Sequence, residues 1–167
     1  VIWTTTPWTL PANLAISAHP AVTYLAYDLN GRVLVVAKEL LASFLAEVAP
    51  DELAIREVKV AESAPEISAP SLKDPSKILG YFEGKSLEGV EYTHVLNGRV
   101  CPVILGEHVT TDTGTGLVHT APGHGAEDYD VGRKYGLETL SPVDASGRFT
   151  EEAGEFAGQQ IFEANPK

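Results

Sequence analysis

Three consecutive threonines near the N-terminus are the first side chains in this sequence that could do chemistry. Thr4, Thr5 and Thr6 follow Trp3 and precede Pro7 in the stretch WTTTPW. Each hydroxyl can donate and accept a hydrogen bond, so the row could contact hydroxyl or carbonyl groups of a polar ligand. The alternative is structural, because β-branched residues favour strands, in which Thr5 would face opposite to Thr4 and Thr6. Spacing alone leaves both interpretations open, and contact of all three with one ligand requires the strand to bend or end before Pro7.

A second group of reactive side chains lies in the stretch HTAPGHGAED. It places His119 at the end of an expected strand, His124 in a glycine-flanked loop and Asp128 in the first turn of an expected helix. An ionised Asp128 could receive an ammonium group, and His119 could form a fixed wall beside it. In the structural alternative, Asp128 only favours the helix dipole and His124 is only a loop imidazole. The residues by themselves do not decide between the two interpretations.

Other chemistries fit these residues less well. A metal site built from the two histidines and Asp128 lacks an evident fourth ligand, and a Pro-Gly pair breaks any helical register between the histidines. The chain has no G-x-S-x-G motif for a serine nucleophile, and the GTG at 114–116 lacks the rest of a phosphate-binding pattern. The single cysteine, Cys101, lies in the apolar run RVCPVIL. We therefore expect it to be a buried hydrophobic residue, and a multi-cysteine zinc site is excluded.

The elements that must position these groups follow from apolar spacing and turn residues. Two β-like runs, 22–29 and 32–37, flank Asn30-Gly31, which predicts a hairpin. Apolar residues at helical spacing predict a helix over 39–49, ended by Pro50. Further strands are expected at 53–60, 78–84, 89–96 and 99–105, and a loop or insertion within 61–84.

The stretch 114–137 is expected to form a strand, a Gly/Pro loop and then a helix. Acidic residues begin that helix and basic residues precede its stop at Gly136, an order that suits the helix dipole. No clear linker divides the chain, so residues 1–167 are expected to form one domain. The predicted class is α+β, mainly antiparallel β, with a barrel-like core and a few peripheral helices.

Composition limits the partners and the setting. The formal charge of −11, from 12 Lys+Arg and 23 Asp+Glu, argues against broad attraction to phosphate backbones. No run is long and apolar enough to span a bilayer, and no signal peptide is evident, so a soluble cytoplasmic protein is expected. Because the chain contains no Met, we expect it to be a segment of a longer protein.

Two segments of the chain together resemble a known family. WTTTPWTLPAN (3–13) and GTGLVHTAPGHGAEDYDVGRKYGL (114–137) are similar to the signature segments of the editing domain inserted in class I aminoacyl-tRNA synthetases, specifically the isoleucyl type. Residues 5–8, Thr-Thr-Pro-Trp, follow the isoleucyl form, where valyl and leucyl relatives typically carry Thr-Thr-Arg-Pro-Glu or Thr-Thr-Arg-Pro-Asp. The segment 119–125 also matches isoleucyl over valyl. The two motifs cover about a fifth of the chain, and nothing in 61–100 matches a motif.

This resemblance implies hydrolysis of valine wrongly attached to isoleucine tRNA. A synthetic pocket that separates two amino acids by one methylene discriminates weakly, so a second site must accept valine and exclude isoleucine. The implied partners are the aminoacylated 3′ end of that tRNA, its valine moiety and the rest of a parent synthetase. The signatures of the class I synthetic site, His-x-Gly-His and Lys-Met-Ser-Lys-Ser, do not occur in this sequence. Aminoacylation and ATP use are therefore expected elsewhere in the parent.

The resemblance also implies a role for each residue of the two groups. Asp128 would bind the α-amino group of the aminoacyl ester, and His119 with the WTTT strand would limit the side-chain pocket by size. The three threonines would contact the ester, the terminal ribose or the attacking water. The implied catalytic residues are Thr4, Thr5, Thr6 and Asp128, and the implied substrate-binding residues add Trp3, His119 and His124. No metal or other cofactor is implied in this domain. The alternatives are valyl-type editing of threonine and a non-catalytic barrel that binds a nucleotide or an amino acid.

Overall fold

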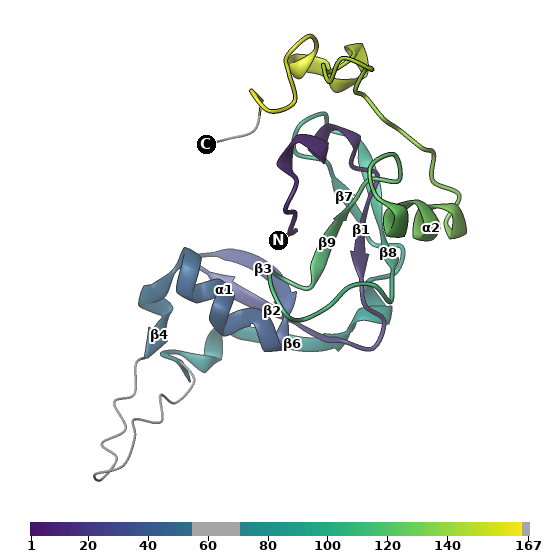
Figure 1. The fold of residues 1–167 in the computed structure, drawn as a ribbon. Coiled ribbons are helices and arrows are strands. Elements are labelled where there is room, and N and C mark those ends of the chain that lie inside the picture. The colour runs from purple at the N-terminus through teal and green to yellow at the C-terminus, as the bar shows by residue number, and fades with distance from the viewer. Residues whose placement is uncertain (55–70, 165–167) are drawn as a thin grey trace, which may run out of the picture.

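The structure, a computed structural model, describes residues 1–54 and 71–164 (Figure 1). One sheet has the strand order β7-β8-β1-β9, a second β3-β2-β6, and a third pairs β4 with β5. The first comprises β1 (Ala15–Ala18), β7 (Glu91–Thr93), β8 (Val100–Leu105) and β9 (Leu117–Thr120). The second comprises β2 (Thr23–Leu29), β3 (Arg32–Ala37) and β6 (Ile78–Glu83), and the third β4 (Leu53–Ala54) and β5 (Ser71–Leu72). The helices are α1 (Leu41–Val48) and α2 (Ala126–Lys134), with 3₁₀ helices η1 (Pro7–Ala12), η2 (Lys38–Leu40), η3 (Pro50–Glu52), η4 (Pro75–Lys77), η5 (Gly84–Leu87) and η6 (Glu151–Phe156).

The predicted α+β class with mainly antiparallel sheets and few helices is confirmed. The β1–β8 pair runs parallel, whereas the other paired strands run antiparallel. The sequence predicts a barrel-like core. In the described residues the sheets do not close into a barrel, and the two larger sheets share one apolar core. Its buried members come from both sheets and from η2: Ile16, Ala18, Tyr24, Val36, Ala37, Leu40, Val103 and Leu117.

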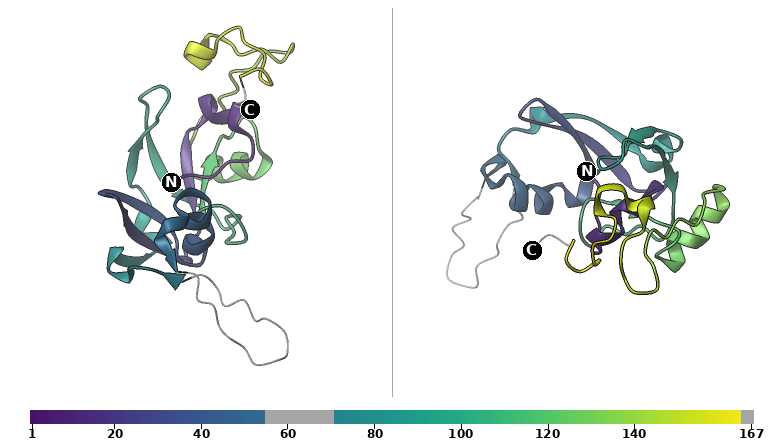
Figure 2. Two further views of the ribbon diagram at one scale, coloured as in Figure 1. Left: turned by 90° about the vertical axis from the view of Figure 1, so that its left-hand side faces the viewer. Right: turned by 90° about the horizontal axis from the view of Figure 1, so that it is seen from above.

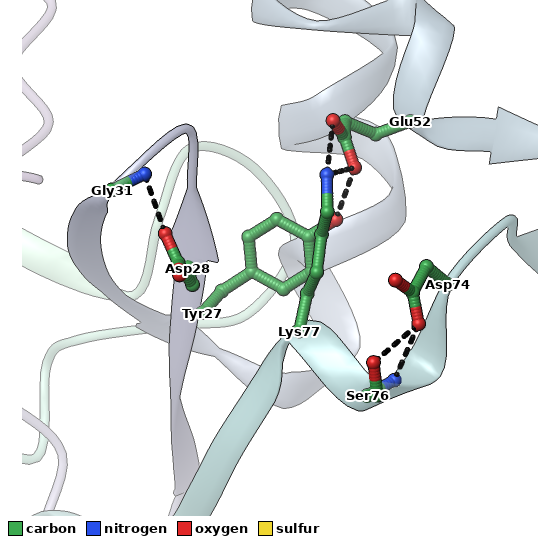
Figure 3. Close-up of polar contacts among 7 residues, drawn as sticks. All are labelled: Tyr27, Asp28, Gly31, Glu52, Asp74, Ser76 and Lys77. Atoms are coloured by element: carbon green, nitrogen blue, oxygen red, sulfur yellow. Dashed lines mark hydrogen bonds and ion pairs between the residues drawn. The ribbon is translucent and has the colours of Figure 1, made fainter.

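The predicted hairpin and first helix are confirmed. β2 and β3 pair in antiparallel register around Asn30-Gly31, and both turn residues have positive φ, at 54° and 81°. The Asp28 carboxylate accepts a hydrogen bond from the Gly31 N–H over 2.7 Å and fixes the turn (Figure 3). The helix predicted over 39–49 begins as η2 and continues as α1, whose buried Leu41 and Leu45 pack with residues of β2.

The strand, loop and helix predicted over 114–137 are also present, as β9, the Gly/Pro loop and α2. In α2 the buried Val131 packs against Ala15 of β1 and Ile104 of β8, which anchors the helix beside the first sheet (Figure 1). β1 itself, the short run AISA, was not expected from the sequence. All four of its residues are buried, so it has no polar alternation to mark it as a strand.

A polar cluster connects the two chain segments that flank residues 55–70. The Glu52 carboxylate accepts hydrogen bonds from the buried Tyr27 hydroxyl over 2.8 Å and from Lys77 Nζ over 2.6 Å (Figure 3). The antiparallel pair β4–β5 joins the same two segments, and the Lys73 N–H donates a hydrogen bond to the Glu52 carbonyl. We call Tyr27, Glu52 and Lys77 the neck cluster.

The remaining predictions for this region concern stretches that the structure describes only in part. The strand expected over 53–60 is described only at 53–54, and 55–60 lie outside the described residues. Of the loop or insertion expected within 61–84, residues 61–70 also lie outside them, while 78–83 form β6, as the apolar run predicts. Cys101 is buried at 2% exposure, as expected.

The C-terminal segment leaves α2 and returns over η1, as two views of the ribbon show (Figures 1 and 2). Its 3₁₀ helix η6 brings Phe156 beside Phe149, and both line a hollow shared with Trp8 and Leu10 of η1. The C-terminal segment therefore covers part of η1. Among residues 1–54 and 71–164, no helix has the length and apolarity to cross a membrane.

Candidate functional site

The prediction that the threonine row forms a strand is wrong beyond Trp3. Trp3 makes a single parallel bridge with Val118 of β9, after which the chain bends at Thr5. The Thr4 hydroxyl accepts a hydrogen bond from the Thr6 N–H over 3.0 Å, and this local bond competes with strand pairing. The chain therefore leaves the sheet before Pro7, the condition under which all three threonines can face one ligand.

η1 begins at Pro7 because proline fits the first position of a helix. Its missing N–H is not needed there, and its fixed φ suits the turn. The Thr9 N–H donates to the Thr6 carbonyl over 3.0 Å, and the Thr9 hydroxyl donates to the same oxygen over 2.7 Å. Thr6 is thus held by the first turn of the helix that follows it.

The glycines of the GTG stretch have a structural role against Trp3. Gly114 has φ +80°, and a Cβ at that position would lie 2.5 Å from the indole ring. Between the glycines, the buried Thr115 hydroxyl donates to the Val1 carbonyl over 3.0 Å. This stretch therefore supports the N-terminal segment.

The two groups of reactive side chains meet at one pocket of about 360 Å³. The bend at Thr5 supplies one side of it, and the end of β9 with the start of α2 supplies the other. Every residue proposed from the sequence lies in its lining, which consists of Trp3, Thr4, Thr5, Thr6, Trp8, Thr9, Val118, His119, His124, Gly125 and Asp128. A larger hollow of about 480 Å³ lies along α2 and the end of β8 and contains none of those residues.

His119 is fixed on both edges of its ring. It is 6% exposed, with Nδ1 2.7 Å from the Asn13 side-chain nitrogen and Nε2 2.9 Å from the Thr9 hydroxyl. Burial lowers the pKa of His119 to about 4, with smaller contributions from His94 and His124. The ring is therefore neutral near neutral pH, and both of its nitrogens are engaged within the protein.

Asp128 supplies the carboxylate of the pocket from the first turn of α2. Its Oδ2 accepts a hydrogen bond from the Ala121 N–H over 2.8 Å, which ties the Gly/Pro loop to the helix. Among the described residues that line the pocket, Asp128 is the one with an acidic side chain. Since the buried imidazole beside it is neutral, the pocket favours a cationic group.

His124 stands across from Trp8 in the lining. Their rings meet edge to face, with centroids 5.2 Å apart. His124 Nε2 is buried and has no hydrogen-bond partner within the described part of the chain. Burial lowers the pKa of His124, and the nearby Asp128 opposes that shift. This histidine is thus more than a solvated loop residue.

Sequence reasoning missed Trp8, Thr9, Val118 and Gly125 as lining residues, and the support from Asn13 and Tyr92. Trp8 and Thr9 lie within the quoted segment WTTTPWTLPAN. They were missed because the sequence predicts a strand at the threonine row, whereas Thr6 and Thr9 are i and i+3 neighbours in a 3₁₀ turn. Tyr92, on β7, donates a hydrogen bond to Asn13 Oδ1. The two lie 79 positions apart, and no local pattern connects them.

Comparison with known proteins finds relatives among the isoleucine–tRNA ligases, and the chain spans about 15% of their length. No protein-family model matches it. It is 49% identical over all 167 residues to the isoleucine–tRNA ligase of Symbiobacterium thermophilum, spanning 15% of that protein. It is 46% identical to that of Acholeplasma laidlawii over 99% of the chain and 16% of the relative, and 48% identical to that of Desulforamulus reducens over 99% and 15%.

Solved structures agree at the level of fold. The cytosolic leucyl-tRNA synthetase editing domain of P. falciparum has a TM-score of 0.54 at 15% identity, over 92% of this chain and 51% of that one. GlLeuRS-CP1 has a TM-score of 0.53 at 19% identity, over 81% and 48%. Along its full length the chain is therefore similar to one segment of the isoleucine–tRNA ligases, and it has the fold of the synthetase editing domains.

Proposed function

We propose that the chain hydrolyses the ester of valine wrongly attached to isoleucine tRNA. The observation that carries this proposal is the single pocket in which the threonine row, His119 and Asp128 converge. The Asp128 carboxylate and the row of hydroxyls suit an aminoacyl ester, which carries an ammonium group beside a carbonyl and a ribose. The relatives' identity as isoleucine–tRNA ligases supports this choice of substrate.

Asp128 binds the α-ammonium group of the aminoacyl moiety. One carboxylate oxygen already accepts from the Ala121 N–H, which fixes the carboxylate in place and leaves the second oxygen for the ligand. A charge-assisted hydrogen bond to an ammonium is stronger than a neutral one and requires a free amino group. The pocket thereby selects aminoacyl-tRNA over a chain whose amino group is blocked.

His119 and Trp3 limit the space for the amino-acid side chain. Both nitrogens of His119 are engaged, so its ring contributes shape rather than proton transfer. Trp3 lies against Gly114, which restricts movement of the indole away from the pocket. Valine fits within these walls, and isoleucine, one methylene larger, is excluded.

Hydrolysis proceeds by attack of a water oxygen on the ester carbonyl carbon. The bond from that carbon to the ribose oxygen breaks, the ribose oxygen takes up a proton from the attacking water, and valine and free tRNA leave. Thr4, Thr5 and Thr6 orient the water and the ester and stabilise the charge that develops on the carbonyl oxygen. His124 contacts the substrate from the opposite side. The scheme requires no metal ion.

The net charge of −11 indicates that this chain holds only the end of the tRNA. We propose that the body of the tRNA is held by the remainder of a parent synthetase, in the cytoplasm. The chain then needs to contact little more than the terminal adenosine and its aminoacyl group.

The test compares Asp128→Ala with Asp130→Ala. Asp130 is an exposed carboxylate in the same helix and does not line this pocket, so its variant is a matched control. The chain is assayed by itself and grafted in place of the matching segment of an isoleucine–tRNA ligase, with isoleucine tRNA charged with valine, threonine or isoleucine. We expect release of valine from the wild type and from Asp130→Ala, and a loss of about 100-fold or more in Asp128→Ala.

Each other outcome would overturn a part of the proposal. Full activity in Asp128→Ala would show that Asp128 does not bind the ammonium group. Release of threonine instead of valine would indicate valyl-type specificity, and release of isoleucine would contradict exclusion by size. Binding of the charged tRNA without release of any amino acid would identify a non-catalytic binding module.

A further inference from the structure

We propose that Thr9 is a positioning residue that joins the two walls of the pocket through one hydroxyl group. It fixes the His119 ring relative to the threonine row and thereby sets the size limit for the amino-acid side chain. The proposal rests on the function proposed above and assigns a role to a residue that the sequence motifs alone do not mark.

The contacts of Thr9 reach both walls. Its hydroxyl lies 2.9 Å from His119 Nε2, at the end of β9, and 2.7 Å from the Thr6 carbonyl, at the end of the threonine row. Thr9 is 5% exposed, so these contacts are shielded from water. The two walls come from residues more than 100 positions apart, and this hydroxyl is a direct polar connection between them.

The direction of each hydrogen bond follows from Asn13, on the other edge of the imidazole. The Ala15 carbonyl, 2.9 Å away, can only accept, so the Asn13 atom facing it is the amide nitrogen. That nitrogen also donates to His119 Nδ1, while Tyr92 donates to the amide oxygen. Asn13 is fully buried, and its amide has one orientation that satisfies all three partners.

The tautomer of His119 is thereby determined. A neutral imidazole that accepts at Nδ1 carries its proton on Nε2 and donates it to the Thr9 hydroxyl. Thr9 in turn gives its single hydroxyl proton to the Thr6 carbonyl. The chain of donors runs from Tyr92 through Asn13, His119 and Thr9 to Thr6, and every proton in it is committed to a partner.

This arrangement explains how a histidine can serve as a wall. A buried polar ring with an unsatisfied nitrogen would rotate toward water or a ligand, and the pocket would then change shape. With both nitrogens satisfied, the ring presents a constant outline to the substrate. Thr9 supplies the acceptor for Nε2 and at the same time holds the carbonyl of Thr6.

The test uses Thr9→Val, Thr9→Ser and Thr150→Val. Valine keeps the shape of threonine but removes the hydroxyl, whereas serine keeps the hydroxyl. Thr150→Val is the matched control, because the Thr150 hydroxyl is buried without a partner among the described residues and Thr150 does not line the pocket. Two readouts are taken: nitrogen and proton NMR of the His119 imidazole in the 167-residue chain, and the ratio of valine to isoleucine release from isoleucine tRNA by the grafted ligase.

In the wild type we expect His119 protonated on Nε2 and not on Nδ1, with slow exchange of the Nε2 proton. Thr9→Val should speed that exchange and lower the valine-to-isoleucine ratio by about tenfold, the scale of one unsatisfied buried hydrogen bond. Thr9→Ser should restore both readouts, and Thr150→Val should change neither.

The proposal is overturned if Thr9→Val leaves both the Nε2 signal and the ratio unchanged, or if Thr9→Ser fails to restore them. It is also overturned if the wild-type ring is protonated on Nδ1. Failure of the proposed function is distinguishable from these results. A wild type that releases no amino acid removes the hydrolytic function, while the NMR signals still decide whether Thr9 positions the ring.

Discussion

At the scale of single residues, the neutral state of His119 is the property on which the pocket depends. Its ring is held between Asn13 and Thr9, and neither contact provides a carboxylate that would stabilise an imidazolium. Burial is the main reason that its pKa falls to about 4, from an ordinary value of 6.5. Because the His119 ring is neutral, it does not compete with a cationic ligand for the Asp128 carboxylate, which also lines the pocket.

Folding stability should therefore depend on pH through His119. Between pH 6.5 and about 4 the unfolded chain binds a proton at this histidine that the folded chain does not, so stability falls as the pH falls through that window. On going from about pH 7 to about pH 4.5, we expect the wild type to lose about 1–3 kcal/mol more than His119→Gln. Urea unfolding of both proteins at the two pH values measures the difference. The same pH dependence in both would show that His119 is not the group responsible.

At the scale of elements, the short 3₁₀ turn η1 and the bend before it decide the geometry of the site. The sequence predicts a strand for WTTT because β-branched residues favour one, but the Thr4 hydroxyl and Pro7 end it after Trp3. The hairpin at Asn30-Gly31 was predictable because its signal is local. The parallel pairing of β1 with β8 was not, since it depends on contacts between distant parts of the chain.

The candidate site, like the fold, was predictable from the sequence only where the signal is local. The threonine row, His119 and Asp128 were identified through residues within two short segments. Their convergence on one pocket could not be derived from spacing, because it requires β9 to pair with β1 and to bridge Trp3. Thr9 was missed because its role depends on a contact between the two segments, with His119. Tyr92 was missed because it lies outside both segments.

The neck cluster gives a prediction for the second sheet. Hydrogen bonds from Lys77 and then Tyr27 hold the pKa of Glu52 below its ordinary value, so the cluster is intact above that value and is lost in acid. Lys77→Met should lower the melting temperature at neutral pH, because it leaves the Glu52 carboxylate and the buried Tyr27 hydroxyl without their cation (Figure 3).

The control for this prediction is Lys85→Met, which removes the exposed ion pair between Lys85 and Glu83. Exposed pairs contribute little to stability, so its melting temperature should stay close to that of the wild type. Thermal unfolding followed by circular dichroism measures both variants. Equal melting temperatures for the two variants would show that the neck cluster does not stabilise the fold.

At the scale of the whole molecule, two open sheets with a common core carry the candidate pocket, which lies between the N-terminal segment and the start of α2. The strongly acidic charge and the localised pocket agree with the proposal that the chain contacts only the aminoacylated end of a tRNA. Among the described residues, no group of three or more His, Cys, Asp or Glu side chains is arranged to hold a metal ion. Under the proposed function, selection between valine and isoleucine depends on the shape of the pocket, which His119 and Trp3 limit.

The most direct test of that assignment is the rate of isoleucine release from correctly charged isoleucine tRNA by His119→Ala and by the wild type, each grafted into an isoleucine–tRNA ligase. Removing the ring enlarges the pocket, so His119→Ala should release isoleucine at least about tenfold faster than the wild type while still releasing valine. If His119→Ala leaves isoleucine untouched while valine release continues at its normal rate, His119 does not set the size limit and the account of selection by shape is contradicted.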